Sequence, residues 1–110
     1  MEINVRKEKN ISIVSVTERM DAVTTPEFEK SMSDLISKGE KTFLINFSAL
    51  DYISSAGLRS ILTIAKRLKG ENGEILFSGL KGTVEEVFKI SGFYSILKIF
   101  ESEEAALLKL

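Results

Sequence analysis

Apolar and polar residues alternate strictly at the start of the chain. Ile3 and Val5 alternate with polar neighbours, and residues 11–17 (ISIVSVT) continue with the same period of two. This alternation is typical of β-strands. Lys9 and Asn10 lie between the two runs and suit a turn, so we predict an N-terminal antiparallel hairpin.

Helical periodicity begins after residue 24. Thr24 and Glu27 have capping-box spacing, with Pro26 in the first turn, and Gly39 suits a left-handed C-terminal cap. The first helix is therefore expected between these signals. A second helix is predicted from about Leu58 to Lys69 because its apolar residues recur on one face.

Two further helices are predicted from their end signals. Thr83 is expected to cap the third helix, whose inward positions include Ile90, and Gly92 closes it. Ser102 is expected to cap the fourth, which runs through Leu108. In both helices acidic residues occupy the first turn, where they complement the helix dipole.

Strands alternate with these helices. Residues 42–47 form a nearly continuous apolar run, which is typical of a parallel strand covered on both faces. Residues 74–78 and 95–100 are the next predicted strands, whereas residues 48–53 are expected to form a loop. The pattern predicts an α/β fold in a single domain, residues 1–110: a mixed sheet of about five strands flanked by about four helices.

Composition narrows the possible functions. The chain has no His and no Cys, so the usual nucleophile–base pairs and the common zinc sites cannot be assembled. We therefore expect a binding protein, not an enzyme, without metal or cofactor. The net charge of −1 with dispersed bases argues against direct nucleic-acid binding. No apolar run reaches membrane-spanning length, and the N-terminus lacks signal-peptide order, so we expect a cytoplasmic protein that does not bind membranes. A monomer is the default expectation for a chain of this size.

One short segment has the composition of a ligand or modification site. Ser54-Ser55-Ala56-Gly57 follows an apolar strand and precedes a helix, which is where α/β folds place ligands. A serine there can cap the helix, or it can accept a phosphate that the unpaired backbone N–H groups stabilise. The residues alone favour the cap.

The wider segment, residues 44–58 (LINFSALDYISSAGL), resembles the signature of the anti-sigma factor antagonists, the STAS domain family. Asp21 falls where the family has an Asp after its second strand. Residues 88–93 are similar to the family's late helix, and residues 100–107 to its closing strand and helix. The resemblance therefore extends over nearly the whole chain, with Ser54 in place of the Asp that usually precedes the motif serine.

The resemblance implies a partner-switching regulator. Family members bind, while unphosphorylated, an anti-sigma factor that is also a serine kinase, and so free a sigma factor. Phosphorylation of the serine matching Ser55 releases the partner, and a serine phosphatase resets the cycle. Ser54 is the alternative acceptor. The expected partner surface comprises Asp21, Ala22, Val23, Ser54, Ser55, Gly57, Arg59, Ser60, Thr63 and Arg67.

Two other interpretations remain open from the sequence. The chain could be a scaffold or docking subunit that binds constitutively to a signalling or ATPase complex. Alternatively, Asp21 could be only a turn residue, and the outer face of the second helix an ordinary solvated face. A small enzyme is disfavoured because His and Cys are missing.

Overall fold

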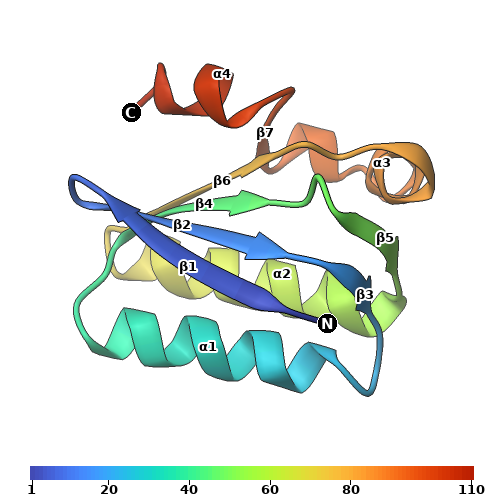
Figure 1. Cartoon of the computed structure of the whole chain (residues 1–110), viewed down its shortest axis with the longest axis horizontal. Helices are drawn as coiled ribbons and strands as arrows, with labels where there is room; N and C mark the ends of the chain where they lie inside the picture. Colours follow the sequence, from blue (N-terminus) through green and yellow to red (C-terminus); the bar gives the residue numbers. More distant parts are fainter.

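Five strands form the central sheet of the computed structural model, which describes residues 1–110. Their spatial order is β1-β2-β4-β6-β7 (Figure 1). β1 runs antiparallel to β2, and the other neighbouring strands are parallel. This confirms the predicted hairpin and the mixed sheet. The strands are β1 (Ile3–Glu8), β2 (Ile11–Val16), β4 (Thr42–Asn46), β6 (Glu74–Ser78) and β7 (Lys98–Phe100).

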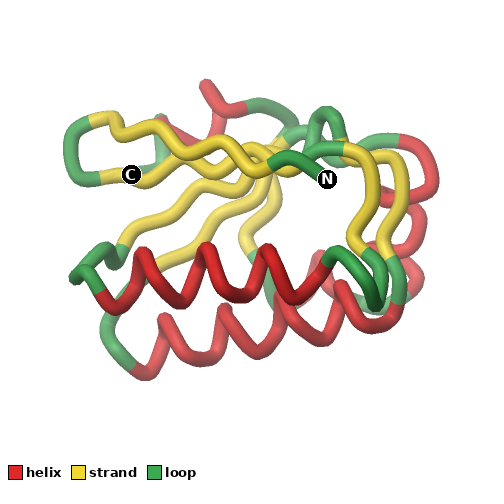
Figure 2. Tube along the Cα trace, turned by 60° about the horizontal axis from the view of Figure 1, so that its bottom comes forward, coloured by secondary structure: helices red, strands yellow, loops and turns green.

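Helices cover both faces of the sheet. α1 (Thr25–Ser37) and α2 (Ser55–Gly70) lie side by side on one face (Figures 1 and 2). The short α4 (Glu103–Leu107) lies on the opposite face, and α3 (Gly82–Ile90) precedes a 3₁₀ turn, η1 (Phe93–Ser95), that leads to β7. None of these helices combines the length and the apolarity that a membrane crossing requires.

The pleat of the parallel strands divides the core into two clusters. In β2 and β4, Val14 and Ile45 join the large cluster beneath α1 and α2, whereas Ile13 and Leu44 join the small cluster beside Ala106 of α4. Successive side chains of a strand point to opposite faces, so both faces need apolar residues. This explains the continuous apolar run at residues 42–47 and confirms that the strand is covered on both sides.

A second, two-stranded parallel sheet corrects the sequence prediction. β3 (Glu18–Met20) pairs with β5 (Leu50–Ile53), where the sequence predicts a loop over residues 48–53. These strands are only three and four residues long, and a run that short carries little periodic signal. α3 packs against β5.

The ends of α1 are only partly as predicted. Gly39 has a φ of +99° and donates from its N–H to the carbonyl of Ile36, which confirms the left-handed cap. Thr24, however, makes no capping hydrogen bond to the helix. Its hydroxyl donates to the carbonyl of Arg19 at 2.8 Å and accepts from the N–H of Asp21 at 3.0 Å, so it closes the preceding turn instead.

The later elements also begin and end differently from the prediction. α3 is capped at Lys81 instead of Thr83, whose hydroxyl donates to the carbonyl of Asp51 at 3.2 Å. Ile90 is 87% exposed, which contradicts its expected inward position. The predicted strand over residues 95–100 shortens to β7 because η1 ends at Ser95 and residues 96–97 form a turn before the strand begins.

The half-buried carboxylate of Glu103 connects α4 to the sheet. Glu103 accepts hydrogen bonds from the guanidinium of Arg6 on β1 at 2.7 Å and from the amide of Asn46 on β4 at 2.6 Å. Ser102 caps the same helix, as predicted, by accepting from the N–H of Ala105 at 3.1 Å. The hydrogen bond from Arg6 is the main reason that the pKa of Glu103 lies below its ordinary value.

We predict that Glu103→Gln lowers the free energy of unfolding by about 1 kcal/mol at neutral pH, a modest value because Arg6 is half exposed. A lowered folded-state pKa means that this stabilisation is complete above the unfolded value of about 4.3 and is lost as pH falls through the folded value. Urea unfolding from pH 7 to pH 3 should therefore show a smaller pH dependence in the variant. The neighbouring Glu104→Gln is the control, and an equal effect of the two substitutions would contradict the assignment.

Candidate functional site at the start of α2

The two serines of the motif have separate roles. Ser54 is the N-cap of α2, with an extended backbone, and its Oγ accepts from the N–H of Gly57 at 3.4 Å. Ser55 is the first residue of the helix, which begins three residues before the predicted Leu58. The capping role that the sequence could not assign to either serine therefore belongs to Ser54.

Ser55 presents a free hydroxyl to solvent. Its residue is exposed, and its Oγ makes no hydrogen bond within the chain, whereas Ser54 is only half-exposed. The first turn of a helix leaves backbone N–H groups without intrahelical partners, and the helix dipole adds partial positive charge there. α2 has no acidic residue in its first turn, so no carboxylate already occupies this position. A group with negative charge would be stabilised at Ser55.

Asp21 organises the loop beside this helix start. Its Oδ1 accepts from the backbone N–H groups of Val23 and Thr24, each at 3.0 Å, and its Oδ2 accepts from Nε of Arg19 at 3.3 Å. The bond from Thr24 contributes most to lowering the pKa of Asp21. This turn holds Val23 outward, 86% exposed. Asp21 therefore shapes the loop, which supports its interpretation as a turn residue.

Backbone contacts connect the Asp21 loop to the serines. The N–H of Ser54 donates to the carbonyl of Met20, the last residue of β3, at 2.8 Å. Gly57 packs directly behind, where an added Cβ would lie 2.7 Å from Cγ1 of Ile53 and 3.2 Å from Cβ of Met20. Gly57 is buried. It was expected on the partner surface, but the structure gives it a packing role because only a glycine fits between the helix and the small sheet.

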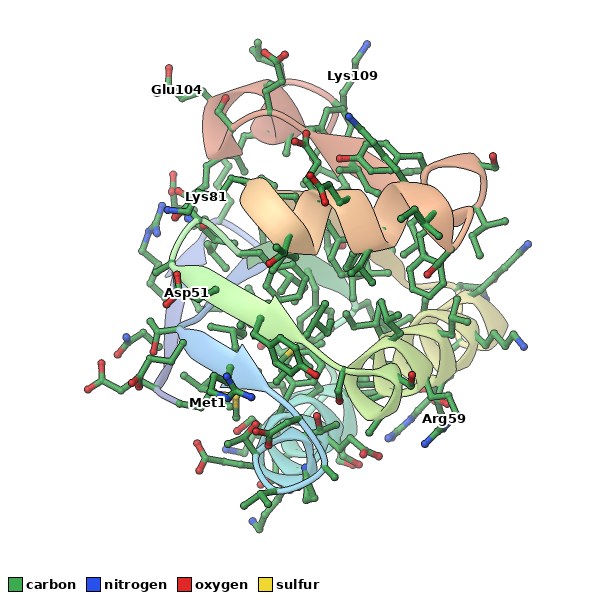
Figure 3. All side chains as sticks on the ribbon, turned by 90° about the vertical axis from the view of Figure 1, so that its right-hand side faces the viewer. Met1, Asp51, Arg59, Lys81, Glu104 and Lys109 are labelled. Carbon is green, nitrogen blue, oxygen red and sulfur yellow. The ribbon has the colours of Figure 1, made fainter.

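The outer face of α2 is exposed at three of its four predicted positions. Arg59, Thr63 and Arg67 recur every four residues and all are exposed. Figure 3 shows Arg59 pointing away from the molecule. Ser60, the fourth position, was expected on the partner surface but is only 4% exposed. It lies one position further round the helix, toward the core. Arg67 contacts α1, because its Nη1 donates a hydrogen bond to Oγ of Ser33 at 2.9 Å.

Tyr52 is a surface residue that the sequence analysis did not single out. It lies on β5, is 40% exposed, and carries the guanidinium of Arg19 at 4.3 Å from its ring centroid. The pairing of β3 with β5 places Tyr52 beside Arg19 and the Asp21 loop. Only the register of this small sheet reveals that Tyr52 belongs to the site. We call the set of exposed side chains around the serine the Ser55 surface; it consists of Val23, Tyr52, Ser55, Arg59 and Thr63.

Comparisons with known proteins identify the family. A model of the STAS domain matches residues 2–106. The chain is 37% identical over 106 residues to BtrV of Bordetella bronchiseptica, a protein assigned as an anti-sigma factor antagonist, covering 96% of this chain and 91% of the relative. A crystal structure from Thermotoga maritima, assigned in the same way, overlays with a TM-score of 0.93 at 19% identity, covering 97% and 92% of the two chains.

Two solved structures of one protein, in its unphosphorylated and phosphorylated forms, also match. SpoIIAA, an anti-sigma factor antagonist of Bacillus, overlays in its unphosphorylated form with a TM-score of 0.76 at 15% identity, covering 98% of this chain and 96% of that one. Its phosphorylated form gives 0.75 at 19% identity, covering 98% of each chain. The chain belongs to the STAS domain family of anti-sigma factor antagonists, as its signature segment predicts.

No cluster of three or more His, Cys, Asp or Glu side chains in the structure is placed to hold a metal ion. The Ser55 surface presents a serine hydroxyl, the aromatic ring of Tyr52 and the guanidinium of Arg59. All three are groups that can bind another protein.

We predict that Gly57→Ala lowers the free energy of unfolding by about 1–3 kcal/mol, because the new methyl group overpacks the contact with Ile53 and Met20. Gly70→Ala is the matched control in the same helix. A Cβ there meets nothing within 4 Å, and alanine has the higher helix propensity, so this variant should be unchanged or slightly more stable. Thermal unfolding followed by circular dichroism separates the two, and a stable Gly57→Ala protein would contradict the packing role.

We also predict different stability effects for the two serines. Ser54→Ala removes the N-cap and should cost about 1 kcal/mol. Ser55→Ala removes an unbonded, exposed hydroxyl and should change stability by less than about 0.5 kcal/mol. Urea unfolding of the two variants at neutral pH measures both. The reverse order would show that Ser55 is the structural serine.

Proposed function

We propose that the chain is an anti-sigma factor antagonist that binds, while unphosphorylated, an anti-sigma factor with serine kinase activity, and thereby releases a sigma factor. Phosphorylation of Ser55 ends this binding, and a serine phosphatase restores it. The single observation that carries the proposal is the free, exposed hydroxyl of Ser55 at the start of α2, in a first turn without acidic residues. The cycle belongs in the cytoplasm, where ATP and sigma factors are present.

Electrostatics explain how one group can act as a switch. A phosphoserine carries about −1.5 to −2 charges at pH 7. The N-terminus of α2 stabilises that charge within the domain, so the fold should persist. A partner that covers a neutral Ser55 hydroxyl would instead have to desolvate the phosphate, and this is costly. The modification is therefore expected to change binding more than it changes structure.

Known structures support a switch without refolding. SpoIIAA has been solved in unphosphorylated and phosphorylated forms, and both overlay on this chain over nearly its whole length with similar scores. In that protein, then, one fold accommodates both states. We infer the same for this chain, whose modification would lie outside the core.

Ser55 is a better acceptor than Ser54 for a structural reason. The Oγ of Ser54 is already held by the N–H of Gly57, and its residue is half-buried beside β3. Transfer of a phosphate to that oxygen would require breaking the cap. Ser55 needs no such rearrangement.

The second candidate function is constitutive docking on a signalling or ATPase complex. It is favoured by one feature, the replacement by Ser54 of the Asp that usually precedes the motif serine in the family. If that change prevents recognition by a kinase, the Ser55 surface would still bind a partner, but the binding could not be switched. Phosphorylation is the observation that separates the two functions.

We predict that incubation with the partner kinase and ATP adds one phosphate, measured by intact-protein mass spectrometry. Ser55→Ala should abolish the addition and Ser54→Ala should retain it. Phosphorylation or Ser55→Glu should weaken binding to the kinase by at least about tenfold, which corresponds to about 1.4 kcal/mol. Isothermal titration calorimetry with the purified partner measures this change.

The controls separate switching from docking. Asn10→Asp adds the same charge at an exposed position in the turn between β1 and β2, and it should leave the affinity unchanged. Labelling that disappears in Ser54→Ala but persists in Ser55→Ala would overturn the assignment of the acceptor. Tight binding without any phosphate transfer would favour the constitutive function.

A further inference from the structure

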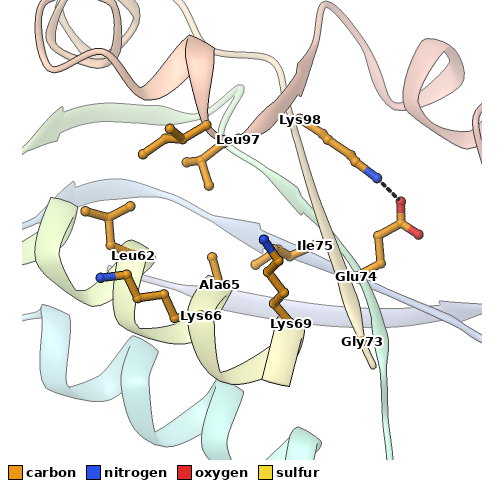
Figure 4. A pocket seen from close by; sticks show the side chains of 10 residues that line it. Leu62, Ala65, Lys66, Lys69, Gly73, Glu74, Ile75, Leu97 and Lys98 are labelled. Carbon is orange, nitrogen blue, oxygen red and sulfur yellow. Dashed lines mark hydrogen bonds and ion pairs between the residues drawn. The ribbon is translucent and has the colours of Figure 1, made fainter. Parts of the chain in front are cut away.

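A separate groove lies near the other end of α2. It is bounded by the last turns of α2, the start of β6 and the segment before β7, and it has a cavity volume of ≈ 460 Å³. Figure 4 shows Leu62, Ala65, Ile75 and Leu97 on its walls. Ile96 also lines the groove and is 62% exposed. Ile96 therefore extends the apolar lining of the groove to the surface of the molecule.

Cations line the rim of this groove. Lys66 and Lys69 come from α2, and Lys98 comes from β7 on the opposite wall (Figure 4). Lys98 pairs with Glu74 at 2.8 Å, whereas Lys66 and Lys69 make no ion pair or hydrogen bond within the chain. Three lysines against one glutamate leave two excess positive charges (3 − 1 = 2) on a protein whose net charge is −1.

The helix dipole explains only part of this charge. Lys69 lies in the last turn of α2, where a cation is stabilised. Lys66 lies one turn earlier, and Lys98 is not on a helix. The helix dipole also gives no reason for the exposed apolar side chain of Ile96. The combination of unpaired cations and an apolar floor therefore needs a different reason.

We propose that this groove docks an acidic, amphipathic segment of a partner protein. Apolar side chains of the segment would cover Leu62, Ile96 and Leu97, and its carboxylates would pair with Lys66 and Lys69. The charges argue for a segment with several carboxylates, not for an amphiphile with a single anionic head group. The two unpaired cations, Lys66 and Lys69, lie three residues apart on α2, so their Cβ atoms are separated by roughly 5–6 Å and can pair with two carboxylates of one segment.

The cations of the groove lie away from Ser55, although Leu62 of the groove directly precedes Thr63 of the Ser55 surface along α2. From Ser55 to Lys69 the helix advances fourteen residues (69 − 55 = 14), which is roughly 21 Å at the usual rise. A partner in the groove would therefore not cover the serine. α2 could then hold two proteins at once, of which only the one at its N-terminal end responds to phosphate.

The test is a titration of ¹⁵N-labelled protein with a synthetic helical peptide that carries Glu on one face and Leu on the other. We expect chemical-shift changes centred on residues 62–69, 73–75 and 96–98. The double variant Lys66→Glu/Lys69→Glu should weaken binding at least about tenfold, and raised salt should weaken binding to the unaltered protein. Ile96→Ser, at an exposed position outside the core, should also weaken it.

Matched controls exclude general charge effects. Lys81→Glu/Lys109→Glu makes the same change of charge at exposed positions that Figure 3 shows away from α2, and it should bind the peptide normally. Ser55→Glu should also bind normally, which separates this proposal from the switch. Equal weakening by the two lysine pairs, or no shifts in the groove at millimolar peptide, would overturn the proposal. Stronger shifts of the same amides by dodecanoate would assign the groove to an amphiphile instead.

Discussion

The site depends on one close approach between a helix and a two-stranded sheet. Met20 and Ile53 end two parallel strands side by side, and Gly57 lets α2 begin directly against them. The hydrogen bond from the N–H of Ser54 to the carbonyl of Met20 then sets where the helix starts. A helix displaced by one residue would turn Ser55 by about 100° about the axis and away from its present position. The packing of Gly57 against Met20 and Ile53 thus determines where the Ser55 hydroxyl is presented.

Burial and exposure alternate around α2 in a way that separates stability from binding. Ile61, Ile64 and Leu68 fasten the helix to the sheet, so its exposed residues are free to vary in chemistry. The N-terminal end presents a neutral hydroxyl in a field that favours anions, and the C-terminal end presents cations. Both ends are therefore suited to negatively charged groups, one through a modification and the other through a partner.

The sequence predicts the main sheet well because its signals are long and consistent. Residues 42–47 are covered on both faces, and the hairpin follows its alternation. The small sheet could not be predicted, since β3 and β5 are too short to show periodicity and their pairing joins segments about thirty residues apart.

The site could be predicted only where it rests on local sequence signals and not on tertiary packing. Ser55 follows from the signature segment and Arg59 from helical spacing. The burial of Ser60, however, depends on how α2 rotates against β5 and β6, and the placement of Tyr52 depends on the unpredicted pairing.

The departure from the family motif at Ser54 has an electrostatic consequence. An Asp at the N-cap would fill the same hydrogen-bonding role for the N–H of Gly57, but it would place a carboxylate beside the hydroxyl that is to be phosphorylated. A phosphate there would meet a like charge within a few ångströms. With Ser54 as a neutral cap, the helix dipole and the first-turn N–H groups would act on the phosphate without that repulsion. The proposed phosphorylated state should therefore be better tolerated by this chain than by a relative with the Asp, and the consequence for kinase recognition becomes a separate property, set by the partner.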